Sequence, residues 1–260
     1  NGGGNTTVRA TTYYNLTVNN AAETYVLAGT TTTSNDLTIT AGILDTVTDQ
    51  NYGLTVGGNY SNSGTFTANS GTVTLNATDA GNTLSGTMTG TSAFNNLTFN
   101  GVGGAWSFGA ESATAANNFT ITNGTVTASS GTLTVNGNFS QNGTFTHNSG
   151  TVTLSGGAAQ TLSGTLTGTS SFYNLTISNA SGTVATDCER TAWVAGVDFD
   201  AAATVANNYV VTTASVKIEY NTGSTYTFNN INWNGQAAGT RIYFRNSAAA
   251  GTWLLNVSGT

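Results

Sequence analysis

An internal repeat constrains this chain more than any other feature of its sequence. Residues 64–75 read GTFTANSGTVTL and residues 143–154 read GTFTHNSGTVTL, so two distant parts of the chain are identical at eleven of twelve positions. The match extends to both sides of this phrase and reaches FNNLTF at Phe94 and FYNLTI at Phe172. A third, partial copy lies upstream, where Tyr13 begins the related phrase YYNLTV. Self-similarity at a fixed period is typical of architectures in which successive copies of one structural unit stack.

A shorter period of about 20 residues recurs inside each copy. Leu97, Phe119 and Phe139 follow one another at this spacing, and Leu175 comes after a longer interval, which we interpret as two shorter turns. Between these anchors, apolar residues alternate with Thr in strands of four to six residues, separated by Gly, Asn-Gly or Ser-Gly. Such alternation is typical of strands, and Gly and Asn provide the positive φ of tight corners. The four anchors are predicted to stack in register inside a narrow bore.

These observations predict an all-β chain folded as a right-handed parallel β-helix, or β-solenoid. Each coil should contain about 20 residues, and the superrepeat should contain about 79 residues. The whole chain, 1–260, is interpreted as a single β-solenoid that is regular over 1–178 and divergent over 179–260. A length of 260 residues then corresponds to about 12 or 13 coils, stacked at roughly 4.8 Å each. Val, Leu, Ile and Phe should point into the bore and Thr should point outward.

An Asn precedes the strand anchor by one or two residues at many corners. Asn tolerates a left-handed backbone, and stacked Asn side chains can hydrogen-bond along the axis as a ladder. A structural role is therefore predicted for nine residues: Asn15, Asn35, Asn95, Asn96, Asn117, Asn118, Asn174, Asn229 and Asn230.

Composition excludes several classes of function. Only 6% of the residues are charged, the net charge is −6, and the five basic residues are scattered along the chain. This argues against nucleic-acid binding, which needs a basic stripe. No apolar run approaches the roughly 18 residues of a membrane helix, so no membrane insertion is expected. The first residue is Asn rather than Met, so we expect a processed or excised chain whose signal peptide has gone.

Two phrases carry a resemblance to known repeats. SGTVTLSGGAAQTLSGTLTGTSSFYNLTI, from Ser149, and TYTFNNINWNG, from Thr225, resemble the Thr-, Asn- and Gly-rich right-handed β-helix repeats of bacterial secreted surface proteins. They are broadly similar to adhesin and autotransporter passenger stalks, and the resemblance covers nearly the whole chain. It implies an extracellular or cell-surface location and an adhesive or scaffold role, without any catalytic motif.

The best candidate for chemistry is the phrase GVDFD at 196–200. Residues two apart share one face of a strand at roughly 6.5 to 7 Å, so Asp198 and Asp200 should face solvent while Val197 and Phe199 enter the bore. That separation overlaps the roughly 6.5 to 9.5 Å between the carboxyl groups of inverting glycosidases. Alternation produces such pairs freely, so a structural role is favoured, with a calcium site and catalysis as alternatives.

The other chemically distinctive residues are interpreted as structural. Cys188, the only cysteine, lies in the charged cluster DCER, where a semi-buried thiol or an intermolecular disulfide is expected. His147 stands where the earlier copy has Ala68, so an exposed bystander is expected. The tryptophans could form a sugar-stacking platform if they were aligned, but their irregular spacing favours packing at corners or ends. They are Trp106, Trp193, Trp233 and Trp253.

The sequence therefore favours a non-enzymatic extracellular structural protein without a cofactor. In this hypothesis, β-solenoid subunits or segments stack end to end into a filament or surface stalk, and the partner is another copy of the chain. Neither end offers a helical or charged cap, so unpaired strand edges are expected to join copies. A carbohydrate-binding or adhesin module that recognises a surface polysaccharide is the main alternative, and a polysaccharide lyase or hydrolase is the other. The predicted assembly interface is Val8, Tyr13, Tyr14, Trp253, Leu254 and Leu255.

Overall fold

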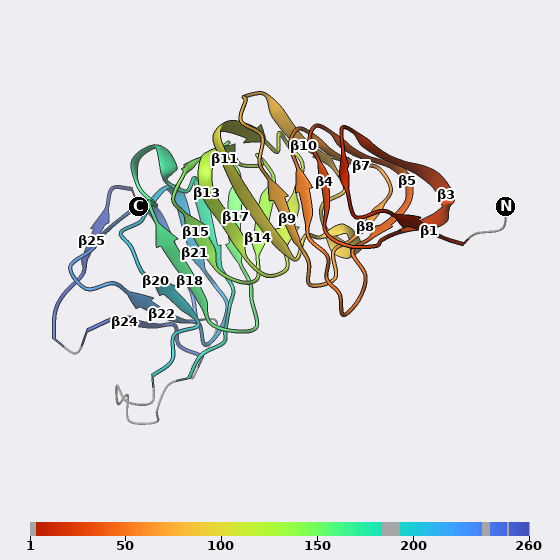
Figure 1. Cartoon of the computed structure of the whole chain (residues 1–260). Helices are drawn as coiled ribbons and strands as arrows, with labels where there is room; N and C mark the ends of the chain where they lie inside the picture. The colour runs from red at the N-terminus through yellow and green to blue at the C-terminus, as the bar shows by residue number, and fades with distance from the viewer. Residues whose placement is uncertain (1–3, 184–192, 236–239, 249, 260) are drawn as a thin grey trace.

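The computed structural model describes residues 4–183, 193–235, 240–248 and 250–259. It confirms the prediction of an all-β solenoid, in which parallel strands stack in about ten turns with a spacing of about 22 residues. The two ends of the chain lie at opposite ends of the stack (Figure 1). No described helix is long and apolar enough to cross a membrane.

Most of the strands are short, as expected for a solenoid with three faces. In the first part of the chain they are β1 (Asn5–Val8), β2 (Thr12–Tyr13), β3 (Leu16–Leu27), β4 (Thr31–Thr33), β5 (Leu37–Asp45), β6 (Leu54–Val56), β7 (Tyr60–Asn62), β8 (Thr65–Thr67) and β9 (Thr72–Leu75). The middle part contains β10 (Asn82–Gly86), the 3₁₀ helix η1 (Gly90–Ser92), β11 (Asn96–Ser107), β12 (Ala113–Ala115), β13 (Phe119–Thr127), β14 (Thr132–Val135), β15 (Phe139–Gln141), β16 (Thr144–Thr146) and β17 (Thr151–Leu154). The last part contains β18 (Gln160–Gly164), the 3₁₀ helix η2 (Gly168–Ser170), β19 (Asn174–Ile177), β20 (Val197–Phe199), β21 (Thr204–Val211), β22 (Lys217–Tyr220), β23 (Thr225–Trp233), β24 (Tyr243–Asn246) and β25 (Leu254–Val257).

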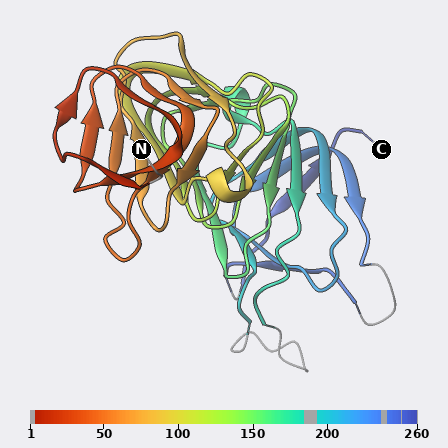
Figure 2. The same ribbon diagram turned by 90° about the vertical axis from the view of Figure 1, so that its right-hand side faces the viewer.

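The chain passes over three faces in the same order in every turn, and six long strands bend around the corner between the first and second faces or between the third and first. The first face holds the starts of β3, β5, β21 and β23, the ends of β11 and β13, and β7, β10, β16 and β25. The second face holds β1, β8, β12, β14, β17 and β19 with the ends of β3, β5, β21 and β23. The third face holds β2, β4, β6, β9, β15, β18, β20, β22 and β24 with the starts of β11 and β13. Figure 2 shows strands of successive turns side by side and pointing the same way.

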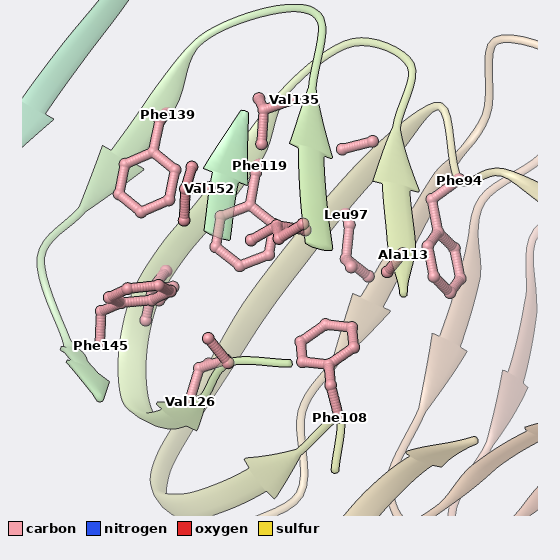
Figure 3. Packing of buried hydrophobic residues seen from close by; sticks show 14 of the residues in the cluster. Phe94, Leu97, Phe108, Ala113, Phe119, Val126, Val135, Phe139, Phe145 and Val152 are labelled. Carbon is pink, nitrogen blue, oxygen red and sulfur yellow. The ribbon is translucent and has the colours of Figure 1, made fainter. Parts of the chain in front are cut away.

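The bore is filled by apolar side chains that alternate with outward-facing Thr, Ser and Asn. Leu97, Phe119 and Phe139 are aligned on successive turns of the third face, and each is fully buried. The rings of Phe119 and Phe139 stack with centroids 5.3 Å apart and an interplanar angle of 15°. Figure 3 shows these residues pointing inward from neighbouring turns, together with Phe145. Such burial of large side chains, turn after turn, is the main source of stability in a fold without a second layer.

The corner Asn residues form the predicted ladder, through side-chain pairs such as Asn35 Nδ2 to Asn15 Oδ1 at 2.9 Å and also through the backbone. Asn96 Oδ1 accepts a hydrogen bond from the Asn118 amide at 3.3 Å, and Asn118 Oδ1 accepts one from the Asn138 amide at 2.9 Å. Asn138 Oδ1 continues the series by accepting from the Thr161 amide at 2.8 Å. Each of these side chains therefore satisfies a backbone N–H group at or near the start of the strand of the next turn.

The superrepeat does not contain a whole number of turns. From Leu16 on the first face, three turns lead to Leu84 on the same face. Leu97, the residue equivalent to Leu16 in the next copy, lies two faces further on, on the third face. The repeat therefore spans three full turns and two of the three faces of the next turn, which makes it about three and two-thirds turns long. The next equivalent residue, Leu175, accordingly lies on the second face.

This geometry corrects two predictions. Leu97, Phe119 and Phe139 stack in register as expected, but the next residue in their row is Leu162, whereas Leu175 is buried on another face. The same phrase occupies a different face in each copy. The turn count is also lower than the predicted 12 or 13, because bulges at the corners of long strands, such as that between Phe99 and Ala105, lengthen the turn to about 22 residues.

Candidate functional site

Several charged side chains of the described C-terminal half lie on the outside of the third face. β20, β22 and β24 lie on consecutive turns, which aligns Asp198 with Glu219 and Glu219 with Arg245. On the preceding turn the same position is Thr161. Asp200, two residues beyond Asp198, is exposed. The outer surface of this face therefore changes from uncharged to charged at one turn.

The alternation predicted for the segment 196–200 is present. Val197 and Phe199 are fully buried in the bore, and Asp198 is half-buried on the outer surface. Partial burial, with smaller contributions from Glu219 and Asp200, raises the pKa of Asp198 to about 6. Like charges close to a carboxylate favour its protonated form, as does loss of hydration. Asp198 can therefore gain or lose a proton in weakly acidic solution, which is the clearest chemical property of this group.

A metal site needs more ligands than this group brings together. Among the described residues, no group of three or more His, Cys, Asp or Glu side chains could hold a metal ion. The neighbouring Arg245 guanidinium lies 5.5 Å from the centroid of the Trp193 ring, a cation–π contact at the edge of the charged group. The group places Glu219 between Asp198, whose pKa is raised, and Arg245. Glu219 was missed from sequence, although it follows Asp198 by one turn of the solenoid.

The four tryptophans lie in separate environments. Trp106 is buried in the bore and contacts Phe99, with ring centroids 5.3 Å apart. Trp233 and Trp253 are partly buried near the C-terminal end. Trp193 contacts Arg245, on the outer surface of the third face. These positions do not place the indole rings in one row, which is the arrangement that a sugar-stacking platform needs.

The predictions for His147 and Cys188 have different outcomes. His147 is half-buried rather than an exposed bystander, because its ring packs against Tyr173 with centroids 5.2 Å apart. Its Nδ1 accepts a hydrogen bond from the Ser149 amide at 3.4 Å, which is a local turn contact. Cys188 and the charged residues around it lie outside the described residues.

The predicted assembly residues at the N-terminal end differ in exposure. Val8 is 6% exposed, since its side chain enters the bore next to Leu27 of the following turn. Tyr13 is half-buried, and its hydroxyl donates to the Arg9 carbonyl at 3.2 Å. Tyr14 is 73% exposed. The first turn therefore presents one largely exposed aromatic side chain, Tyr14, whereas Val8 is already buried.

The C-terminal turn leaves part of the bore uncovered. Leu255 and Val257 continue the inward rows of Tyr226 and Phe228, yet they are 37% and 44% exposed while the residues beneath them are fully buried. Leu254, which points to the outer side of the same strand, is 63% exposed. Val257 was missed from sequence, although the alternation Leu-Asn-Val at 255–257 identifies it as an inward residue.

Trp253 adds to this terminal turn. The centroid of its ring lies 4.3 Å from the ring centroid of Tyr220 and 6.0 Å from that of Tyr226. Nearby, the Trp233 and Phe244 rings are 4.4 Å apart. Aromatic and aliphatic side chains thus line the last described turn. In the deeper turns, such side chains are covered by the next coil.

Comparisons of this chain with protein families, with curated proteins and with solved structures give no match.

Proposed function

We propose that this chain is a non-enzymatic structural protein, a β-solenoid subunit or segment that stacks end to end into an extracellular filament or surface stalk. One observation carries the proposal: the inward residues Leu255 and Val257 of β25 are partly exposed above fully buried Tyr226 and Phe228, so the bore offers an apolar surface that a further turn, from another copy or from a longer chain, would cover. The extracellular location rests on the resemblance of the repeats to those of bacterial surface proteins. Low charge supports the stacking, because little like-charge repulsion opposes it.

The order of faces at the two ends favours a continuous joint between copies. β25 lies on the first face, and β1 lies on the second. Because the chain always passes from the first face to the second, β1 of another copy can follow β25 without skipping a face. In that joint β1 would cover the end of β23, β2 would cover β24, and β3 would cover β25. Each strand would find the parallel neighbour that its edge lacks.

The energy available to the joint comes from ladder pairing and apolar burial. Covering a large apolar side chain fully contributes about 1.5–3 kcal/mol, and Leu255, Val257 and Trp253 start partly exposed, so each would contribute less. Backbone hydrogen bonds along three strand edges contribute about 0.5–1.5 kcal/mol each. The entropy of association opposes these gains, so assembly should depend on concentration.

The test compares two matched substitutions. Val257→Lys places a charge on the open end of the bore, whereas Val102→Lys places the same charge on a corner residue that is 76% exposed and far from either end. Wild-type protein and Val102→Lys should form rods longer than one copy in light scattering and negative-stain images, and Val257→Lys should remain short. The proposal is refuted if wild-type protein stays monomeric at micromolar concentration, or if both variants assemble equally.

A further inference from the structure

The outer surface of the third face carries an uninterrupted row of hydroxyl groups. Strand pairing aligns one outward residue from each of eight successive turns, and every one of the eight is Thr or Ser. We call this set the hydroxyl row: Thr12, Thr32, Thr55, Thr74, Thr98, Thr120, Ser140 and Ser163. Seven intervals of about 4.8 Å make it about 34 Å long. Asp200 follows at the next turn, so the charged group begins where the row ends.

The row exists because the repeat has a fractional number of turns. The first four residues of the row belong to the first copy of the superrepeat. The last four belong to the second copy and occupy different places within the repeated sequence. The shift of one face per copy joins these two short columns end to end on the third face. On the first face, the column equivalent to the last four ends after Ser85: Thr17, Thr38, Ser61 and Ser85.

The hydroxyl row is available to a partner outside the chain. Thr12 is exposed and the other seven residues are partly exposed. None of the eight hydroxyl groups forms a hydrogen bond with another group in the described part of the chain. Inward Thr residues behave differently, since Thr31 Oγ1 donates to the Gly29 carbonyl at 3.0 Å. The row therefore presents eight unused donors and acceptors at one repeated spacing.

We propose that the hydroxyl row binds crystalline water, the surface of ice. A single exposed hydroxyl binds water weakly, but a periodic partner with a matching repeat can engage all eight together, and multivalent contacts of this kind multiply in strength. Ice is a lattice of water oxygens whose short repeat is similar to the spacing of strands in the ladder. Ordered waters held by the row would bridge it to that lattice nearly as well as direct hydrogen bonds.

Three other partners fit the row less well. Polysaccharides are recognised largely through aromatic rings, and the row contains none. Charged mineral surfaces need charged ligands, which begin only after Ser163. A second copy would have the same spacing, but a strip about 34 Å long and about 10 Å wide buries about 340 Å², below the roughly 800 Å² per partner of a stable interface.

The test uses two substitutions in the same local sequence. Thr74 and Thr153 both lie in the phrase GTVTL, but Thr74 is the fourth residue of the hydroxyl row whereas Thr153 lies on the second face. Wild-type protein and Thr153→Lys should inhibit ice recrystallisation equally. Thr74→Lys, which divides the row into three and four, should need about tenfold more protein for the same effect.

A second pair guards against a variant that fails to fold. Thr120→Lys, in the hydroxyl row, and Thr38→Lys, at the equivalent position on the first face, should reproduce the difference, with circular dichroism confirming the β-structure of each protein. The inference is overturned if wild-type protein neither inhibits recrystallisation nor delays freezing, or if the row and control variants act alike. Binding to cellulose or chitin, or a lateral dimer, that is lost in Thr74→Lys would assign the row to those partners instead. None of these results depends on end-to-end stacking, because the row lies on a side face.

Discussion

Replacing Asn118 with Ala should remove one step of the corner ladder and destabilise the solenoid measurably. Asn118 Oδ1 accepts from the Asn138 amide at 2.9 Å, and Asn118 is half-buried. Deleting one partner of such a bond costs about 1–3 kcal/mol when the other group is left buried. Asn138 is exposed, so water can replace the lost acceptor and the cost should fall near the low end, about 1 kcal/mol.

Asn118→Asp is the matched control, because the first copy already carries this variation. Asp36 occupies the equivalent position, and its Oδ1 accepts from the Asn59 amide at 2.8 Å. Asn118→Asp keeps the acceptor and should stay within about 0.5 kcal/mol of wild type. Urea titration measures the change, and hydrogen exchange at the Asn138 amide locates it, since a solenoid can open turn by turn. A loss below about 0.3 kcal/mol for Asn118→Ala, or an equal loss for both variants, would refute the role given to the ladder.

Two further predictions concern the bore and the charged group. Phe119→Ala should lower the free energy of unfolding by about 3–5 kcal/mol, because it leaves a cavity between two aromatic rings; a loss under about 1 kcal/mol in urea titration would contradict this packing. The pKa of Asp198 is raised from 3.8 to about 6, so the folded state retains a proton that the unfolded state releases. Stability should therefore fall as pH rises from about 4 to about 6. Asn has no proton to lose, so Asp198→Asn should flatten this part of the profile, and an unchanged slope would argue against the shift.

The sequence predicted the architecture well because each determinant of a β-solenoid is local. Alternation of apolar residues with Thr identified the inward rows, and the short period of the strand anchors identified the turns. The Asn residues before the strand anchors were also recognised, since a corner needs both a permissive backbone and an acceptor for the next N–H group. Asp198 and Asp200 were placed on the outer surface by the same alternation.

The predictions that failed depended on summing many turn lengths. A turn can take up one or two extra residues at a bulge, and such errors accumulate over a whole copy of the superrepeat. The wrong total placed Leu175 in the row of Leu97, although each assignment to the bore was right. It also concealed the alignment of Asp198 with Glu219 and the hydroxyl row. To predict which residues of different turns are in contact, the lengths of all the turns between them must be known, and no local sequence pattern provides these lengths.

A repeat of three and two-thirds turns also limits how such a chain can lengthen by duplication. Inserting one more copy of the unit would turn everything beyond the insertion by one third of a revolution about the axis. A site or partner that depends on the relative orientation of two distant surfaces would then lose its alignment. Three added copies, which together make eleven whole turns, would restore it. Where orientation along the rod is under selection, copy number is therefore expected to change in threes, and where only length matters any number should be found.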